Sequence, residues 1–172
     1  QTYFGLVDGR KTAIIEMAKA NGIHLLEPAQ RNPLLTTTLG TGEMIKAALD
    51  LGVSKIIIGL GGSVTNDAGA GMTQALGVKF LDATGCDAAV GGGQLDQIKK
   101  IDLSGLDARL AQTEIIIASD VNNPLCGANG ASYVFGPQKG ATPEIVKTLD
   151  NNLSHFAKLV EQQLGIDCRE IA

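Results

Sequence analysis

The strongest structural signal in this chain of 172 residues lies at residues 55–67, KIIIGLGGSVTND. Three consecutive isoleucines, Ile56 to Ile58, form the unbroken β-branched run that is found in strands buried on both faces. The glycines and short polar residues that follow favour a tight turn, and helical spacing of apolar residues resumes from about Ala68 to Leu76. The stretch therefore predicts a central strand that passes through a polar loop into a helix.

Signals on either side of this stretch complete the expected fold. Residues 2–7 and 11–15 flank Asp8-Gly9-Arg10 and predict an antiparallel hairpin, because Asp-Gly supplies the positive φ angles of a tight turn. Residues 113–118 contain three more isoleucines, so they predict a second buried strand, which ends in the polar sequence SDVNNP at 119–124. Helices are expected at 42–51, capped by Thr41, and from Thr142 to Gly165. We expect an α/β fold with a mixed sheet that opens with an antiparallel hairpin and carries helices packed on it, as a single domain over residues 1–172.

Composition excludes several classes of protein. Apolar residues make up 44% of the chain and charged residues 19%, values typical of a globular protein. Aromatic residues are only 3% and the formal net charge is −4, so neither base-stacking platforms nor a basic patch is indicated. We therefore expect no nucleic-acid partner.

The cysteines and the hydropathy pattern indicate the compartment. Cys86, Cys126 and Cys168 are odd in number and widely spaced, which fits neither a disulfide framework nor a CxxC metal site. No stretch approaches the roughly 20 continuous apolar residues of a membrane span. We expect a cytoplasmic protein with no membrane partner. The chain begins at Gln1 within a predicted strand, and we expect it to be a fragment of a longer polypeptide.

The loop at residues 61–67 is the first candidate site. It lies between a predicted strand and a helix start, where amides and hydroxyls can converge on an anion at the positive end of the helix dipole. It matches neither GxGxxG, because Val64 stands where a glycine is needed, nor the P-loop motif. The alternative is that the glycines serve turn geometry and packing while Asn66 or Asp67 caps the helix. The residues alone leave both interpretations open.

Four segments together resemble the type 1 glycerate kinases. They are IIGLGGSVTNDAGAGM at 57–72, TTTLGTGE at 36–43, SDVNNPL at 119–125 and FGPQKGA at 135–141, and the resemblance covers essentially the whole chain. It implies a protein of two α/β lobes in which this chain is the lobe inserted into the other. The family's Ala-Pro-Asp-Ser-Phe-Lys-like, glycine-rich and Thr-Gly-Glu-Gly-like segments have no counterpart in the chain.

The resemblance implies an activity. It implies ATP-dependent phosphorylation of D-glycerate, with 2-phosphoglycerate favoured over 3-phosphoglycerate as product, ATP and Mg²⁺ as cofactors, and the remaining lobe of the same polypeptide as partner. This chain would supply one wall of the cleft and would be inactive alone. Two alternatives stay open: a non-catalytic substrate-binding or lid domain, and a nucleotide-binding regulatory module.

Candidate site residues follow from the same motifs. Asp67 and Asp120 are the expected catalytic carboxylates: either could orient the glycerate hydroxyl or hold Mg²⁺ through water, although helix capping or an Asx turn would also explain them. Asp120 is the candidate magnesium ligand, and no direct metal ligand is assigned. Lys139, in a loop bounded by glycines, could neutralise phosphate as a point charge or be a solvated surface lysine. The residues expected to bind substrate or phosphate are Thr38, Gly40, Thr41, Gly61, Gly62, Ser63, Thr65, Asn66, Asn123 and Lys139.

Overall fold

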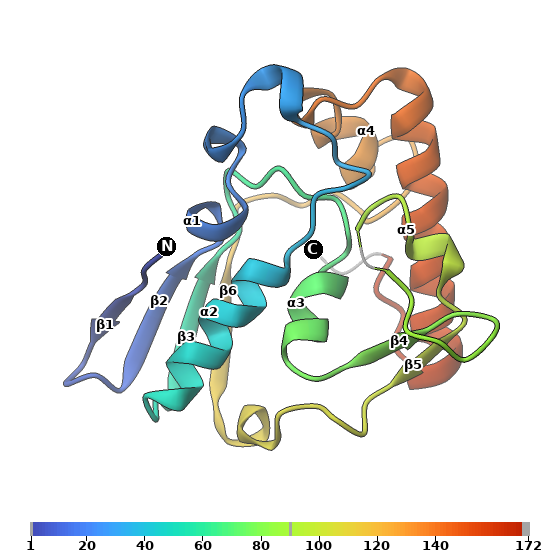
Figure 1. The fold of residues 1–172 in the computed structure, drawn as a ribbon. Helices are drawn as coiled ribbons and strands as arrows, with labels where there is room; N and C mark the ends of the chain where they lie inside the picture. Colours follow the sequence, from blue (N-terminus) through green and yellow to red (C-terminus); the bar gives the residue numbers. More distant parts are fainter. Residues whose placement is uncertain (1, 90, 170–172) are drawn as a thin grey trace.

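The structure is a computed structural model that describes residues 2–89 and 91–169, and it has the expected mixed α/β fold (Figure 1). Its strands are β1 (Gly5–Val7), β2 (Thr12–Glu16), β3 (Lys55–Gly59), β4 (Lys79–Leu81), β5 (Lys100–Asp102) and β6 (Glu114–Ala118). Its α-helices are α1 (Ala18–Asn21), α2 (Leu39–Asp50), α3 (Ala70–Ala75), α4 (Ala131–Phe135) and α5 (Pro143–Leu164). Short 3-10 helices lie at Ile23–Leu25, Pro28–Gln30, Leu95–Gln97, Ala108–Gln112 and Pro137–Lys139. None of the described helices is long and apolar enough to cross a membrane.

The main sheet has the strand order β1-β2-β3-β6. β1 and β2 form the predicted antiparallel hairpin, whose turn residues Asp8, Gly9 and Arg10 all have positive φ angles of 53°, 62° and 70°. β2, β3 and β6 are parallel, with Ile57 paired to Ile14 on one side and to Ile116 on the other. The carboxyl ends of these three strands therefore lie at the same edge of the sheet.

Helix α2 covers one face of this sheet (Figure 1). Ile15, Ile56 and Ile58 point into that interface and are at most 1% exposed. The helix begins at Leu39 rather than at the expected Gly42, so the prediction that Thr41 is its N-cap is wrong. Thr41 lies inside the helix because its hydroxyl is satisfied by the side chain of Asn21, and this polar pair is buried.

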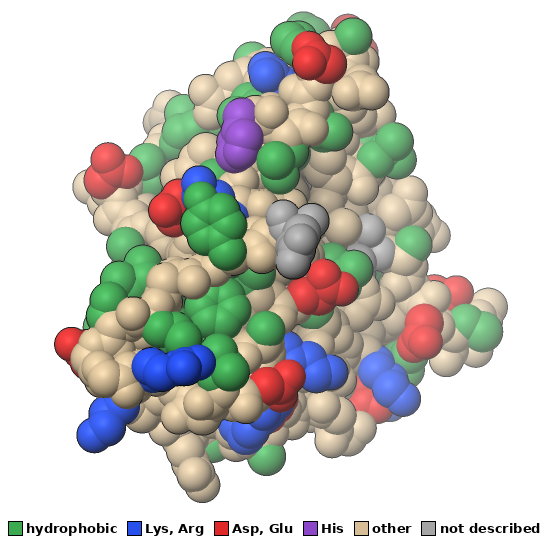
Figure 2. Space-filling model, turned by 60° about the vertical axis from the view of Figure 1, so that its left-hand side comes forward, with side chains coloured by type: hydrophobic (Ala, Val, Ile, Leu, Met, Phe, Trp, Pro, Cys, Tyr) green, Lys and Arg blue, Asp and Glu red, His purple; other side chains and the backbone are tan. Residues whose placement is uncertain are grey.

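Strand β6 was predicted to be buried, and in the structure it is exposed. It is an edge strand among the described residues, and Ile115, Ile116 and Ile117 are 41%, 38% and 49% exposed. The physical reason is that the core cluster under α2 takes in side chains of β2 and β3 and none of β6, so the β-branched run of β6 stays uncovered. The sheet face opposite α2 is also open at Val7 and Ile14. On the hairpin side of the molecule, hydrophobic side chains lie at the surface among charged ones (Figure 2).

A second hydrophobic cluster lies between the β4–β5 ribbon and α5. β4 pairs antiparallel with β5, a strand that the sequence did not indicate. Helix α5 follows its prediction: Thr142 accepts a hydrogen bond from the Ile145 amide, and Gly165 ends the helix with a φ of 71°. The rings of Phe80 and Phe156 meet edge to face with centroids 5.7 Å apart.

Helices α2 and α3 cross closely because glycine lies at each contact. A Cβ atom on Gly42 would lie 2.3 Å from the Met72 carbonyl oxygen, and one on Gly71 would lie 1.9 Å from Thr37 Oγ1. Both distances are below any real contact, so the two positions accept only glycine at this separation. The crossing brings residues 37–38 against the start of α3.

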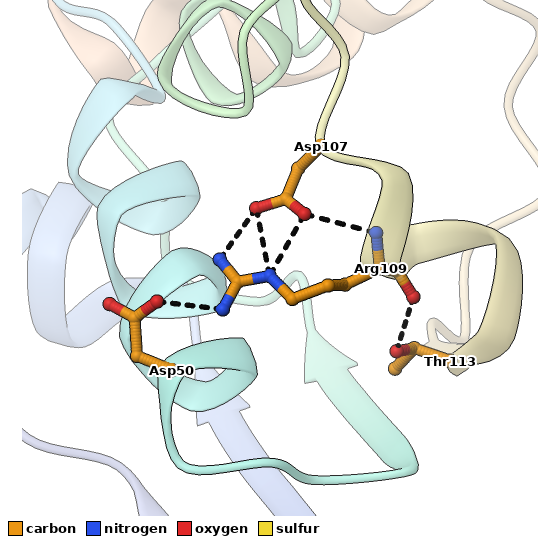
Figure 3. Close-up of polar contacts among 4 residues, drawn as sticks. All are labelled: Asp50, Asp107, Arg109 and Thr113. Carbon is orange, nitrogen blue, oxygen red and sulfur yellow. Dashed lines mark hydrogen bonds and ion pairs between the residues drawn. The ribbon is translucent and has the colours of Figure 1, made fainter.

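An ion-pair cluster joins the end of α2 to the segment that leads into β6 (Figure 3). The Arg109 guanidinium contacts Asp50 at 2.8 Å and Asp107 at 2.6 Å. Hydrogen bonds from Arg109 hold the pKa of Asp107 at about 2. The Arg109 carbonyl also accepts a hydrogen bond from Thr113, at the start of β6. The cluster is exposed, so it fixes geometry more than it adds to the free energy of unfolding.

Candidate functional site

A pocket of about 240 Å³ lies where β3 and β6 end. Three segments line it: residues 60–63 after β3, residues 118–121 at and after the end of β6, and Phe135, Gln138 and Lys139 at the end of α4 and just after it. Ligands of open α/β sheets gather beyond the carboxyl ends of the strands, at this kind of position. The structure thus brings together five predicted site residues: Gly61, Gly62, Ser63, Asp120 and Lys139.

Lys139 is a half-buried cation in the wall of the pocket. Its Nζ donates a hydrogen bond to the Thr65 carbonyl at 2.6 Å and lies 3.5 Å from Ser63 Oγ. Within the described residues it forms no ion pair, since no carboxylate oxygen lies within 4 Å of it. Desolvation lowers the pKa of Lys139 to about 8, and the charge of Asp67 partly opposes this shift. The ammonium is therefore held in place without a counter-ion.

Asp67 lies outside this pocket and is only 1% exposed. Its Oδ2 accepts hydrogen bonds from the hydroxyls of Thr37 and Thr38, at 3.1 and 2.9 Å, and from the Thr38 amide at 2.8 Å. Amides at the start of α3 complete the set: Gly71 donates to Oδ2 at 3.2 Å and Gly69 to Oδ1 at 3.3 Å. The anion at this helix start is thus the protein's own carboxylate, as the capping interpretation expected.

The threonines before and within α2 belong to the same buried network. The Thr38 hydroxyl donates to Asp67 and accepts from the Met72 amide at 2.9 Å, while Thr41 pairs with Asn21. Gly40 packs beside Ala20, where a Cβ atom would lie 3.1 Å from the alanine methyl. The structure therefore places Thr38, Gly40 and Thr41 away from the pocket, although the sequence grouped them with it.

The remaining candidates support the loops around the pocket. Thr65 acts through its backbone carbonyl, which accepts from Lys139. Asn66 is buried and accepts a hydrogen bond from the Ser132 hydroxyl at 3.3 Å. Asn123 donates to the Asn129 carbonyl at 3.1 Å and closes the loop after β6. These three residues shape the walls rather than face the cavity.

Sequence reasoning missed two side chains of the pocket. Phe135 and Gln138 both line it, next to Lys139. The available signal was their place in the FGPQKGA segment that already contained Lys139. Asp120 is exposed and is the one carboxylate lining the pocket in the described part of the chain. Within residues 2–89 and 91–169, no three His, Cys, Asp or Glu side chains are placed to hold a metal ion.

The fold and this pocket define the class: an α/β protein with a polar pocket at the carboxyl ends of its parallel strands, the usual place for a small ligand. A family model described as the glycerate kinase family matches residues 1–172. The chain belongs to the glycerate kinase family.

Individual relatives agree with this family. The chain is 58% identical over 172 residues to a glycerate kinase of Haemophilus influenzae and 52% identical over 168 residues to a glycerate 2-kinase of Escherichia coli. It covers 46% and 44% of those proteins, and so spans less than half of the length of the curated relatives it matches. A crystal structure described as glycerate kinase 2 from Salmonella typhimurium LT2 is 53% identical with a TM-score of 0.96, covering 99% of this chain and 46% of that one.

Proposed function

We propose that the full-length protein transfers a phosphoryl group from ATP to a hydroxyl of D-glycerate, and that this chain supplies one wall of the active-site cleft. The observation that carries the proposal is the pocket itself, in which one small cavity is lined by Asp120 and by Lys139, a cation with no ion pair among the described residues. Phosphoryl transfer needs an oriented hydroxyl nucleophile and groups that stabilise negative charge. The family membership and the names of the relatives supply the substrate.

The two aspartates take different roles in this proposal. Asp120 faces the pocket, so its carboxylate orients the glycerate hydroxyl and accepts its proton. Asp67 is saturated by hydrogen-bond donors and positions the loop that carries Gly61 to Ser63. Asp67 is thus a positioning residue.

The cofactors ATP and Mg²⁺ fit this wall only in part. A cavity of about 240 Å³ is smaller than the roughly 300–1,000 Å³ of pockets for drug-sized ligands, so it suits a small acid or a phosphate group rather than a whole nucleotide. For magnesium the pocket offers one carboxylate, Asp120, and Mg²⁺ usually keeps several waters and takes one or two carboxylates plus phosphate oxygens. The rest of both sites belongs to the remaining polypeptide.

The product of this reaction is 2-phosphoglycerate. Support comes from the relatives, because the Escherichia coli protein that is 52% identical is called a glycerate 2-kinase. A cytoplasmic location is also part of the proposal, and the three cysteines, which are all unpaired, are consistent with a reducing compartment.

The remaining lobe of the same polypeptide is the partner in this proposal. Its docking surface includes the open edge strand β6, where Ile117 is exposed, and the uncovered sheet face, where Ile14 and Ile116 are exposed. An apolar edge strand left in solvent favours association with other chains, so covering by the same polypeptide is the simplest explanation for β6. The relatives are more than twice the length of this chain, so they have enough further residues to form such a lobe.

A second candidate function is a substrate-binding lobe that does no chemistry. It is favoured by one observation, namely that a single carboxylate lines the pocket while Asp67 is fully engaged. The two functions predict different kinetics for the same variant. A regulatory nucleotide module has less support, because the cavity is small.

The deciding experiment is Asp120→Asn in the full-length enzyme. We expect kcat for glycerate phosphorylation to fall by at least about 100-fold with little change in KM or melting temperature, because an interaction made in the transition state is lost. Asp96→Asn, an exposed aspartate away from the pocket, is the matched control and should keep normal kinetics. A normal kcat with a raised KM would instead select the substrate-binding lobe.

A further inference from the structure

The starting observation is a half-buried positive charge that forms no ion pair with any of the described residues. The ammonium and guanidinium groups that do form ion pairs among the described residues are at the surface, for example Lys55 with Glu114 and Arg109 with Asp50. Lys139 instead contacts two neutral groups, the Thr65 carbonyl and Ser63 Oγ, and borders a hollow that Leu153, Met17 and the buried Asp67 also line. Burying an unpaired ammonium is costly, so a protein that keeps one has a use for the charge.

Holding the loop together does not by itself require this charge. The Thr65 carbonyl takes one of the three N–H bonds of the ammonium at 2.6 Å, and the contact to Ser63 Oγ, at 3.5 Å, is at the limit of a hydrogen bond. A neutral hydrogen-bond donor could bond to the Thr65 carbonyl equally well. The ammonium, the Ser63 hydroxyl and the backbone of Gly61 and Gly62 all border the same cavity, which leaves positive charge and donors facing it.

We propose that Lys139 and Ser63 form the binding site for a small anionic group of the substrates, the carboxylate of a hydroxy acid or a terminal phosphate, and that this site binds its anion only while Lys139 is protonated. The inference rests on the proposed function and adds the identity of the anion-binding group and its dependence on pH. The incoming anion replaces the missing counter-ion. It therefore stabilises the ammonium that the empty pocket disfavours.

The charges around Lys139 allow the pH dependence to be stated. Asp67, on the α3 side, opposes the lowering of its pKa to about 8, and Asp120 lines the same pocket after β6. Residues 60–66 and 134–138 carry no ionisable side chain, and Tyr133 on α4 is exposed. From α5 and the residue after β2, the side chains that line the adjoining hollow with Lys139 are the apolar Leu153 and Met17. Lys139 is thus the group of this pocket that changes charge between pH 7.5 and 9.5.

The test measures equilibrium binding by calorimetry on the full-length protein, with D-glycerate alone and with ATP alone as probes. The variants are Lys139→Met, Lys139→Arg and the control Lys147→Met, which removes an exposed lysine of α5 and gives the same change in net charge. At pH 7.5 we expect Lys139→Met to weaken binding of at least one probe by about tenfold or more, and Lys147→Met to leave it within about twofold. Whichever probe responds identifies the anion as carboxylate or phosphate.

The pH profile separates anion binding from a merely structural role. In the wild type the affinity for the responding probe should fall roughly 20-fold from pH 7.5 to 9.5, as linkage to one group of pKa about 8 requires. Lys139→Arg should bind equally at both pH values, because arginine stays charged. A flat wild-type profile, unchanged affinity of Lys139→Met for both probes, or no measurable binding of either probe by the wild type overturns the proposal.

Turnover is measured separately, so that the two proposals can fail independently. A wild type that binds D-glycerate through Lys139 yet transfers no phosphate would refute the kinase function and leave the anion site intact. Conversely, a Lys139→Met enzyme with normal binding and turnover would remove the anion site and leave the kinase function in place.

Discussion

At the level of single residues, burial separates Asp67 from Asp120. Asp67 is 1% exposed and accepts five hydrogen bonds from residues 37–38 and 69–71, whereas Asp120 stands exposed at the pocket. A carboxylate that already accepts five donors has little capacity left for a substrate, and its loss leaves those donors unpaired. The same side-chain type therefore stabilises the fold at one position and is free for chemistry at the other.

The first prediction concerns Asp67→Asn. An amide keeps one acceptor oxygen and places a donor against the Thr38 and Gly71 amides, so we expect the free energy of unfolding to fall by about 3 kcal/mol or more. Urea denaturation of the full-length protein measures this change, and Asp120→Asn is the matched control that should unfold like the wild type. Normal stability with a collapsed kcat for Asp67→Asn would show that Asp67 takes part in the chemistry.

The second prediction concerns the stability contribution of Lys139. Burial places its folded pKa at about 8, below the value of 10.5 expected in the unfolded chain. Below pH 8 the lysine is charged in both states and its burial destabilises the fold in full. Between about pH 8 and 10.5 the unfolded state binds more protons, so this penalty decreases as the pH rises.

Lys139→Met should therefore be as stable as the wild type or more stable at pH 7, with an advantage that shrinks by pH 10. Urea midpoints at both pH values, referred to Lys147→Met, measure the difference. Stability of Lys139→Met that falls below the wild type at pH 7 would mean that the bond to Thr65 outweighs the desolvation of the charge.

The sequence indicated which residues lie at the pocket, but not which candidate residues belong to a buried hydrogen-bond network instead. Gly61, Ser63 and Asp120 were found because the carboxyl ends of parallel strands meet at one edge of a sheet. Thr38 and Thr41 lie in a buried network, which the sequence could not indicate because a threonine near a glycine has the same local pattern when it binds a ligand and when it belongs to such a network. Only long-range contacts, such as that of Thr38 with Asp67, distinguish the two cases.

At the level of elements, those with strong local signals were predictable. The hairpin turn, β3, the end of α2 at Asp50, one residue before its predicted end, and the capped helix α5 follow their sequence patterns. The exposure of β6 was not predictable, because a β-branched run reports the propensity for a strand and not what covers it. The three-residue strand β5 was missed since it is too short to show alternation.

The third prediction concerns the crossing of α2 and α3. Alanine favours helix by up to about 1 kcal/mol over glycine, but a methyl group on Gly71 would lie 2.7 Å from the Leu39 amide nitrogen. We expect Gly71→Ala to lower the free energy of unfolding by about 2 kcal/mol, since overpacking wins over propensity. Gly61→Ala is the control, because its added methyl meets nothing within 4 Å. Thermal denaturation of both variants measures the effect, and equal melting temperatures would contradict the close crossing.

At the level of the whole molecule, the open edge of β6 presents backbone N–H groups that pair with no other strand of the described residues. The Glu114 amide donates to the Ser54 carbonyl at 3.0 Å, so alternation along the strand turns the Ile116 amide toward β3 and those of Ile115 and Ile117 outward. If the rest of the polypeptide adds a strand here, the outward amides become bonded as well.

The fourth prediction is that Ile115 and Ile117 amides exchange with solvent as slowly as the Ile116 amide in the full-length protein. Hydrogen exchange followed by NMR resolves the three positions, and Ile116 is the internal control because it bonds to β3 in either case. Fast exchange confined to Ile115 and Ile117 would show that this edge stays free and that the second lobe docks elsewhere.

The network around Asp67 also has a consequence for the order of folding. It joins residues 37–38 to residues 67–71, about 30 positions apart, with α2 and β3 between them. Burying a carboxylate costs a large desolvation free energy unless hydrogen-bond donors replace the water. We therefore expect these two segments to become ordered together, after the elements that separate them. The loop that carries Gly61 to Ser63 leads directly to Asp67, so it becomes ordered in the same step. We therefore expect the ability to hold a ligand to be acquired late in refolding, when helix and strand content is already complete.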